Sequence, residues 1–451
     1  MRNFTLFLIF SFSTFVSFSQ YIEGQVLDAT TNEPIEGVNV FMEGINRGAI
    51  TNEKGNYYLK FPYEIVKNDI ISFSHVAYGK LEIPYFQKKK NYSVSLFVDL
   101  NKLEEIKISE RRNLKKYISY KKLSSIKKGV HSFGSILLDD KIYVVGGDAL
   151  VEYNEFRRLF EYDPDRAFQK LVQGVIHNYK KESYYGDLQT YDIKNNMWLK
   201  SKSKFKKRAY HNLNYYNNKI YVLGGKNLSR HGVHIKEYLD DKIEVFDIDK
   251  DAIIIDNTNP HQAVDFASFT YNDTMILMGG SLKLKNNGFK DYSNKVHLYD
   301  FKTGYWYQLG NMPIAKEVKG VLIEDKIYLV GGYNNKPLSS IETFDLTTQK
   351  WKKEGNLFYG ISKPAITHKD NVIYFFNDQK IITYNVLTKE LNEYLIDLPL
   401  VASELFYSDN TLYILGGFRK NSYSFFPSKG LFSVDIAEFN KTKVINSKTL
   451  E

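Results

Sequence analysis

The chain of 451 residues has a formal net charge of +9 and contains no cysteine. Disulfides, cysteine-bound zinc, thiolate chemistry and a lipid on an N-terminal cysteine are therefore excluded, so the fold must depend on its hydrophobic core. Aromatic residues make up 15% of the chain and prolines number only 10, a composition that favours β-structure.

The N-terminal segment, residues 1–19, has the pattern of a secretory signal peptide. Arg2 supplies a positive charge and an apolar stretch follows it. Ser17 and Ser19 stand at the −3 and −1 positions of a cleavage site before Gln20. The apolar run is short for a membrane span of about 20 residues, and no later run approaches that length. We predict export to the periplasm or cell surface, with no transmembrane span after cleavage.

Residues 20–108 alternate short patterned runs with turn sequences. The runs "IEGQVLD", "GVNVFMEG" and "GNYYLKF" have the period of two expected for half-buried strands. In the second of them, Val38, Val40 and Met42 share one face. Asn52 and Gly55 are expected in a tight turn before the third. Several such short strands in one small module predict a β-sandwich.

This module resembles the carboxypeptidase-regulatory-like domain, a transthyretin-like sandwich. The resemblance rests on Gly24, Val26, Asp28, Thr31, Glu33, Pro34, residues 37–40, Gly48, Thr51, Asn52, Gly55, Tyr57 and residues 71–79. It implies an accessory module of exported bacterial proteins and not a peptidase. In agreement, no zinc-ligand set is present, because His75 stands alone and is expected to pack within its strand.

Residues 109–128 form a basic segment with eight Lys or Arg against one Glu, a net charge of +7. Such a stretch can contact anionic surfaces or nucleic acid. The predicted export argues against a nucleic-acid partner. We expect a solvated linker that includes a candidate closing strand for the domain that follows.

One motif recurs from residue 129 to residue 451: an apolar strand that ends in a glycine pair. The pairs end at Gly147, Gly225, Gly280, Gly332 and Gly417. A related strand at residues 372–378 lacks the glycines. A second mark is an aromatic residue followed by Asp or Asn, with Trp or an apolar residue seven positions after the aromatic. It runs from Tyr191 to Trp198, Phe246 to Ile253, Tyr299 to Trp306, Phe344 to Trp351 and Tyr384 to Leu391, and Val434-Asp435 begins a degenerate sixth copy.

These repeats resemble kelch repeats, and six of them imply a six-bladed β-propeller, so the fold class is all-β. The glycines are expected to let the chain turn and let the neighbouring blade approach. The Asp is expected to cap a turn, and the Trp to pack between blades. A phosphate loop would instead need a glycine-rich turn leading into a helix. The ring could close through "YISYKKLSSIKK" before the first blade, which we favour, or through "KTKVINSKT" near the C-terminus.

A ligand is expected on the face where the chain leads into the innermost strand of each blade. Polar side chains occur there in every blade, twelve to fifteen residues before the first glycine position: His131, His211, Asp265, Glu317, Lys319, Lys363 and Glu404. Insertions at 148–186, 226–241 and 281–294 would wall a polar cleft on the same face. In the first, Asp163 and Pro164 predict the start of a helix. The alternative is a solvated channel lining without a specific ligand.

We expect a non-catalytic binding or scaffold protein of the cell envelope, with a glycan, a peptide or another envelope protein as its partner. Its ligand-binding residues would be the seven above together with Arg208. Kelch propellers also include a periplasmic sialic-acid mutarotase. That alternative needs cations for a carboxylate and an acid/base pair, roles open to Arg208, His211, Glu317 and Lys319.

Other chemistries are excluded or weak. Kelch copper enzymes of the galactose oxidase type need a Tyr–Cys crosslink, which a chain without cysteine cannot form. His231 and His234 are three residues apart, but no third ligand is fixed by spacing, so we predict no metal. No cofactor is predicted, and the oligomeric state is open.

Overall fold

The structure is a computed structural model that describes residues 20–42, 44–45, 47–61, 69–75, 77–86, 89–98, 114–181, 183–231, 234–284 and 290–451. The predicted signal peptide lies outside the described residues. The chain divides into two compact units, Met1–Arg111 and Arg112–Glu451, each described by itself. In the described part of the chain, no helix has both the length and the apolar character needed to cross a bilayer.

The N-terminal unit is a β-sandwich of two sheets, with strand orders β4-β1-β7 and β3-β2-β5-β6. The strands are β1 (Gln20–Asp28), β2 (Asn39–Met42), β3 (Arg47–Ile50), β4 (Asn56–Phe61), β5 (Ile70–His75), β6 (Tyr78–Pro84) and β7 (Val94–Leu96). Along β4 every second residue is buried, because successive side chains point to opposite faces. Val38, Val40 and Met42 lie in the same core, as predicted. The predicted turn forms too, since the Gly55 amide donates to the Asn52 carbonyl.

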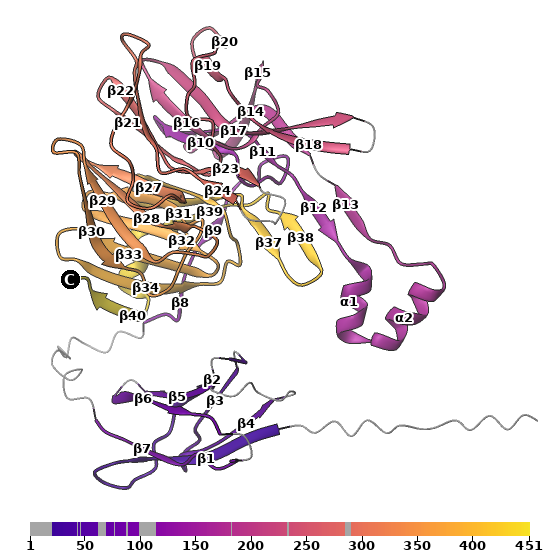
Figure 1. Cartoon of the computed structure of the whole chain (residues 1–451), viewed down its shortest axis with the longest axis vertical. Coiled ribbons are helices and arrows are strands. Elements are labelled where there is room, and N and C mark those ends of the chain that lie inside the picture. Colours follow the sequence, from indigo (N-terminus) through magenta and orange to yellow (C-terminus); the bar gives the residue numbers. More distant parts are fainter. Residues whose placement is uncertain are drawn as a thin grey trace, which may run out of the picture. The chain divides into compact units, whose positions relative to one another are not determined.

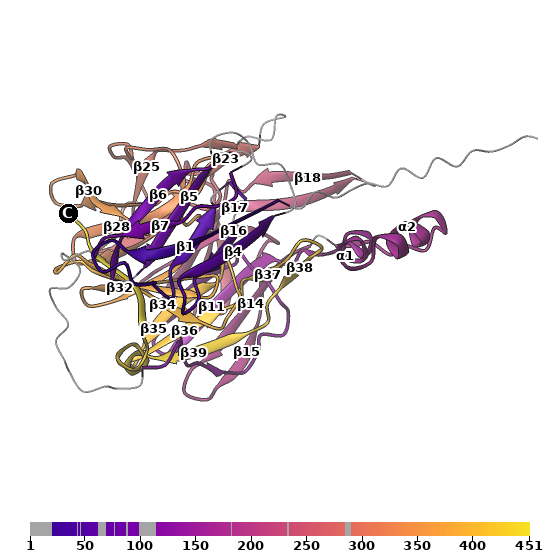
Figure 2. The same cartoon turned by 90° about the horizontal axis from the view of Figure 1, so that it is seen from below.

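The second unit is a propeller of six antiparallel blades (Figures 1 and 2). Blade one comprises β10 (Gly134–Leu138), β11 (Lys141–Asp148), β14 (Tyr184–Asp192) and β15 (Met197–Lys204), and blade two β16 (Ala209–Tyr216), β17 (Lys219–His231), β19 (Ile243–Asp247) and β20 (Ala252–Asp256). Blade three comprises β21 (Ala267–Tyr271), β22 (Thr274–Met278), β25 (Val296–Asp300) and β26 (Trp306–Gln308), and blade four β27 (Glu317–Ile323), β28 (Lys326–Tyr333), β29 (Ser340–Asp345) and β30 (Lys350–Asn356).

Blades five and six contain the ends of the unit. Blade five comprises β31 (Ala365–Lys369), β32 (Val372–Asn377), β33 (Lys380–Asn385), β34 (Glu390–Ile396) and β40 (Val444–Thr449), with β8 (Tyr117–Ile118) parallel to β34. Blade six comprises β35 (Glu404–Ser408), β36 (Thr411–Leu415), β39 (Leu431–Asp435) and β9 (Lys121–Lys122), and the short 3₁₀ helix η2 (Ile436–Lys441) follows β39. The ring thus closes through the N-terminal strand β9, while the C-terminal strand β40 widens blade five.

The glycine pairs form the seams between blades. All ten glycines have positive φ, from 61° at Gly331 to 109° at Gly332. In the first four of these pairs, the amide of the second glycine donates to a carbonyl at the entry to the next blade, as in Gly147 to Arg208 and Gly332 to Ile361, both at 2.9 Å. A side chain would not fit there, because a Cβ on Gly331 would lie 2.5 Å from the Ile361 carbonyl oxygen at the entry to the next blade. The pairs are scaffold joints, as predicted.

The second mark of the repeat is also structural. In each complete copy the aromatic residue and the Trp or its substitute are paired across the third and fourth strands, as in Tyr191 and Trp198. Trp198 contacts the neighbouring blade by donating its indole N–H to the Ser124 carbonyl at 2.8 Å. The Asp that follows the aromatic caps a turn: Asp192 accepts from the Asn195 amide and Asp345 from the Thr348 amide.

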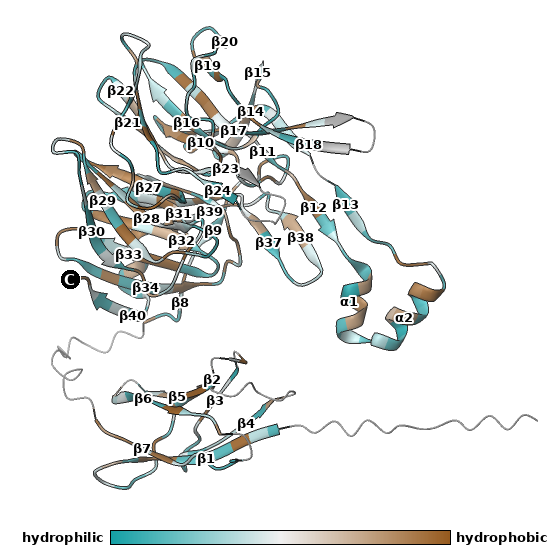
Figure 3. Cartoon of the chain, in the orientation of Figure 1, coloured by the Kyte–Doolittle hydropathy of each residue, from teal (hydrophilic) through white to brown (hydrophobic). Residues whose placement is uncertain are grey.

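Insertions extend from one face of this ring. Blade one carries β12 (Val151–Tyr153), α1 (Glu155–Tyr162), α2 (Pro164–Val172) and β13 (Tyr179–Lys181); blade two carries β18 (His234–Leu239), paired with β17; and blade three carries β23 (Ser281–Leu284) and β24 (Lys290–Tyr292). Helix α2 starts as predicted, with Asp163 as its N-cap and Pro164 in its first turn. Helix α1 was not predicted, and the second insertion is a hairpin where a flexible loop was expected. The hydropathy colouring in Figure 3 shows hydrophobic bands along the strands of the blades.

Candidate functional site

Five of the eight predicted ligand-binding residues meet at the mouth of the propeller channel. A small cavity there is lined by His211, Asp265, Lys319, Lys363 and Glu404, with seven further residues. They converge because each lies at or just before the innermost strand of its blade, and these strands surround the channel. The spacing from the glycine position therefore locates residues that do come together in space.

The charged groups at this mouth are already paired with one another. Lys363 Nζ lies 2.6 Å from Asp265 Oδ2, and Lys319 Nζ lies 2.7 Å from Glu404 Oε1. Burial alone would lower the pKa of Lys363, but the carboxylates of Asp265 and Glu317 outweigh it and raise that pKa. Burial would likewise raise the pKa of Asp265, and Lys363 lowers it instead. Both groups of this pair are charged at neutral pH.

Glu317 and Arg208 line neither this small cavity nor the larger cleft that lies above it. Glu317 accepts a hydrogen bond from Ser281 Oγ at 2.7 Å and forms an ion pair with Lys290, so its charge is compensated within the third insertion. Arg208 is 0% exposed, and its guanidinium donates to Glu244 Oε2 at 2.5 Å. A ligand in the channel mouth therefore cannot reach the Arg208 guanidinium without a rearrangement of blade two.

Arg208 makes a scaffold contact that recurs in blade four and that was not predicted from the sequence. Arg208 Nη1 donates to the carbonyl of Gly224, the first glycine of its blade, at 3.3 Å. In blade four, Lys316 Nζ donates to the carbonyl of Gly331 at 3.1 Å and lies 3.0 Å from Glu342 Oε2. Each cation thus binds the first-glycine carbonyl and a Glu of the third strand. The signal was a cation fifteen or sixteen residues before the first glycine.

His211 is also buried in the blade-one seam. Its Nε2 accepts a hydrogen bond from the Gly134 amide at 3.2 Å, so the ring proton resides on Nδ1. Nδ1 has no hydrogen-bond partner. Burial, and then the charge of Arg208, hold the pKa of His211 well below its usual value. The imidazole is therefore neutral at pH 7 and is a weak base.

His131 and its neighbours have the residue types of a nucleophilic triad without its geometry. Ser132 Oγ lies 3.0 Å from His131 Nδ1, but His131 Nε2 lies 3.8 Å from Asp148 Oδ2, beyond hydrogen-bond range. The Asp148 carboxylate instead accepts from the Tyr210 hydroxyl at 2.9 Å. Burial and the charge of Lys363 lower the pKa of His131 to about 3. A base so weak cannot activate a serine at neutral pH.

Tyr210 occupies the centre of the mouth and was not singled out from the sequence. Its φ of 64° is positive, as are those of Ser132, Asp265 and Ala402 at the corresponding positions of blades one, three and six, so this backbone conformation belongs to the repeat. Lys226 and Lys363 lie 4.8 Å and 5.0 Å from its ring centroid. Its amide donates to the Ser132 carbonyl, and its own carbonyl accepts from the Asp265 amide. Tyr210 thus connects blades one, two, three and five.

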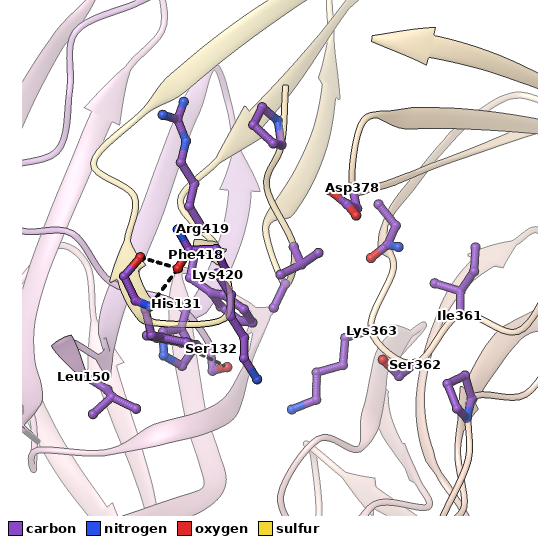
Figure 4. Close-up of a pocket in the computed structure, with 18 of the residues that line it drawn as sticks. His131, Ser132, Leu150, Ile361, Ser362, Lys363, Asp378, Phe418, Arg419 and Lys420 are labelled. Atoms are coloured by element: carbon purple, nitrogen blue, oxygen red, sulfur yellow. Dashed lines mark hydrogen bonds between the residues drawn. The ribbon is translucent and has the colours of Figure 1, made fainter. Parts of the chain in front are cut away.

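Above the mouth lies a larger cleft with a volume of about 1140 Å³. His131 and Lys363 line it, so it is continuous with the charged floor. Figure 4 shows Lys363 between two walls: His131, Ser132, Phe418 and Lys420 on one side, Ile361, Ser362 and Asp378 on the other. The cleft therefore combines apolar, hydroxyl and charged groups, as ligand sites commonly do.

One wall of this cleft comes from a hairpin in blade six, formed by β37 (Phe418–Lys420) and β38 (Ser424–Pro427). Sequence reasoning assigned insertions only to blades one to three. Strand β38 pairs with β12 of blade one, which gives a composite sheet in the order β13-β12-β38-β37. Phe418 and Phe425 stack with ring centroids 4.3 Å apart. The run of aromatics in residues 418–426 was the available signal for this wall.

Residues 135–383 match the KLHDC2/KLHL20/DRC7 Kelch-repeats domain, over more than half of the chain. The chain belongs to the kelch-repeat family. Residues 22–108 match the CarboxypepD_reg-like domain, so both predicted resemblances are confirmed. The site described above is therefore the channel mouth of a kelch propeller, with blades one and six contributing its composite sheet.

Individual relatives are more distant. Human Kelch-like protein 15 is 24% identical over 259 residues, which cover 48% of this chain and 41% of that protein. An F-box/kelch-repeat protein of Arabidopsis thaliana is 29% identical over 87 residues, 19% of this chain and 23% of its own. The chain spans less than half the length of these curated kelch relatives. A solved structure of YjhT aligns with a TM-score of 0.51 at 12% identity, covering 72% of this chain and 99% of that one, a likeness of fold.

The charged groups at this kelch mouth are of two kinds. Its floor carries fixed, compensated charges and histidines that stay neutral, while Arg419 and Lys420 at the rim form no ion pair within the described residues. Among the described residues, no group of three or more His, Asp or Glu side chains is arranged to hold a metal. The side chains of His231 and His234 lie outside the described ones.

Proposed function

We propose that this chain is an exported, non-catalytic binding protein of the cell envelope. Its ligand, a glycan, a peptide or a segment of an envelope protein, occupies the cleft of about 1140 Å³ over the channel mouth. The N-terminal sandwich acts as an accessory module. Kelch propellers generally bind other proteins, and that coarser role agrees with the family match.

The observation that carries this proposal is the pairing of charges on the cleft floor. Lys363 and Lys319 each have a carboxylate partner within 2.7 Å, so these two charges on the floor are compensated. His211 beside them is held neutral by burial. The open cleft above it has an aromatic wall and two cations at its rim, Arg419 and Lys420. Such a site binds an extended ligand through shape, stacking and charge, and needs no chemical step.

The alternative is a sugar-modifying enzyme such as a sialic-acid mutarotase. It would use Arg208, His211, Glu317 and Lys319, of which the mouth cavity brings together His211 and Lys319. Arg208 is fully buried and bound to Glu244, and His211 is held neutral by burial. An acid/base role for this set would require the seam of blade two to open.

Binding can be tested with the purified protein on a defined glycan array and a tiled peptide array. The test variant is Arg419→Glu with Lys420→Glu, because both side chains are exposed at the rim of the cleft. A ligand bound in the cleft should lose about tenfold or more in affinity, since two favourable charges become unfavourable. The matched control is Lys353→Glu, an exposed lysine in the outer strand β30.

Two results would contradict the proposal. One is an array ligand whose affinity is the same for the wild type and the rim variant, because its site would then lie elsewhere. The other is catalysis: NMR exchange spectroscopy that shows faster anomer exchange of sialic acid with the wild-type protein would favour the enzyme alternative. Loss of that exchange in Lys319→Gln would assign it to the channel mouth.

A further inference from the structure

Residues 151–181 form an arm that extends from blade one and contains both helices of the chain's described part (Figures 1 and 2). Its helices are well fixed: Asn154 caps α1, Asp163 caps α2, and Glu155 accepts from Lys170 Nζ at 2.8 Å. Glu155, Leu159 and Ala167 are the buried residues of the two helices. The arm is therefore an ordered helical hairpin with a small inner face.

The larger apolar face of this hairpin points outward. Phe168, Leu171 and Val172 follow the i, i+3, i+4 spacing of one face of α2, and Val175 lies just beyond the end of that helix. They are 52%, 50%, 87% and 41% exposed. We call these four residues the outer stripe. In most surface helices such a stripe faces the core, and a clustered exposed one marks an interaction site. Figure 3 shows hydrophobic segments on both helices of the arm.

Helix α1 adds aromatic side chains to the outer stripe. The rings of Phe156, Phe160 and Phe168 contact one another, with each pair of centroids 5.8 Å apart. Phe160 is nearly half exposed although it belongs to this cluster. The two helices thus present one continuous apolar surface, of the kind that is usually buried between packed helices.

The charges of the arm are divided along its length. Glu161, Asp163, Asp165 and Arg166 lie at the turn between the helices and give it a net charge of −2. The end that joins the blades has a net charge of +2, from Glu152, Glu155, Arg157, Lys170, Lys180 and Lys181. The acidic turn disfavours insertion into an anionic bilayer. It suits a second arm in the opposite direction, because the acidic turn of each copy would then lie beside the basic end of the other.

We propose that two copies of this chain associate through their arms, which pack in opposite directions into a four-helix bundle. Each copy supplies two helices, and a two-fold axis makes the contact self-complementary. The outer stripes and the Phe clusters form its core. The arm is small compared with the roughly 800 Å² that a standard interface buries on each partner, so we expect dissociation constants in the micromolar range. The dimer forms without a ligand and is independent of the proposed function.

Sedimentation velocity of the purified protein across micromolar concentrations tests this proposal. The wild type should shift from monomer to dimer, and Leu171→Ser with Val172→Ser should weaken dimerisation by about a hundredfold or more, because four buried apolar side chains are lost per dimer. Both residues are exposed in the monomer, so its thermal unfolding should not change. Leu199→Ser, at an exposed leucine of β15, is the matched control and should still dimerise.

The relative direction of the arms is tested by charge exchange. Asp165→Lys should weaken the dimer, and adding Lys181→Glu should restore it. A protein that is monomeric throughout, a dimer that the stripe variant forms equally well, or a charge exchange that restores nothing would each overturn the proposal. So would binding to phosphatidylglycerol–phosphatidylethanolamine vesicles that the stripe variant loses, since lipid would then cover the stripe.

Discussion

Blades two and five both place a cation just ahead of the innermost strand, yet the two cations are used differently. Arg208 of blade two is completely buried, bound to Glu244 and to the carbonyl of Gly224. Lys363 of blade five lines the cleft and pairs with Asp265 of blade three, across the channel mouth. Blade five has no glycine pair, and its cation pairs with a carboxylate of another blade. The repeat motif thus holds one cation in a blade seam, whereas the other lines the cleft in which we propose that a ligand binds.

From this comparison we expect Arg208→Ala to cause the largest loss of unfolding free energy. The substitution leaves the buried carboxylate of Glu244 without its cation, while Asp240, 3.5 Å from the guanidinium, keeps Lys206 at 3.1 Å. Breaking a buried ion pair in this way costs about 3–5 kcal/mol of unfolding free energy. Urea denaturation of the wild type and the variant measures it. A loss below about 1 kcal/mol would mean that Arg208 is not a scaffold residue.

The glycine seams provide the second test. Gly331→Ala adds a Cβ 2.5 Å from the Ile361 carbonyl oxygen, across the seam to blade five, at a φ of 61°. Backbone strain and overpacking together should destabilise the protein by about 2–4 kcal/mol. Gly310→Ala is the matched control, because nothing lies within 4 Å of its added Cβ. Equal midpoints of chemical denaturation for the two variants would contradict the seam role.

The third test concerns His261, which occupies in blade three the place that cations take in blades two and four. Its Nε2 lies 3.0 Å from the Gly279 carbonyl and must donate, so its Nδ1 accepts from His297 Nδ1 at 2.8 Å. A second proton on His261 would require the His297 ring to change tautomer and to accept at its Nδ1. Burial, and then His297, lower its pKa to about 3.

The pH dependence follows from the direction of that shift. Above the unfolded pKa of about 6.5 His261 is neutral in both states and contributes nothing to the pH dependence. Below it the unfolded chain binds a proton that the folded chain does not, so stability falls by about 1.4 kcal/mol per pH unit, down to about pH 3. His261→Gln, whose amide can still donate to the carbonyl, should reduce this slope between about pH 6.5 and 5.5. His177→Gln, at an exposed histidine, should leave it unchanged.

The blades of the propeller could be predicted from the sequence because each repeat requires the same turns and the same kind of packing. The glycine pairs, the turn-capping Asp residues and the Trp positions recur, so a contact inferred for one blade holds in the others. The start of α2 was predictable for a local reason, since Asp163 and Pro164 act within one turn. The resemblance to both families then supplied the architecture.

The site was predictable only in part, because the burial of its side chains and the insertions differ from blade to blade. Counting from the glycines located the mouth but did not reveal that Arg208 is buried and Lys363 is not. The depth of each depends on partners in other strands, Glu244 and Asp265, at unrelated sequence distances. Strand β38 pairs with β12, more than two hundred residues away in the sequence, so no local sequence pattern indicated the composite sheet.

The smallest effect on stability, and the sharpest contrast with Arg208, is expected for Lys363→Gln. Its side chain reaches the cleft, and water can replace part of its contact with Asp265, so unfolding free energy should change by about 1 kcal/mol or less. Binding should suffer instead, because the cleft floor loses its cation while Asp265 keeps its negative charge. A ligand from the arrays should bind about tenfold more weakly, by isothermal calorimetry at equal folded fraction. If Lys363→Gln unfolds the protein as Arg208→Ala does, the two cations share one structural role and the distinction between seam and cleft fails.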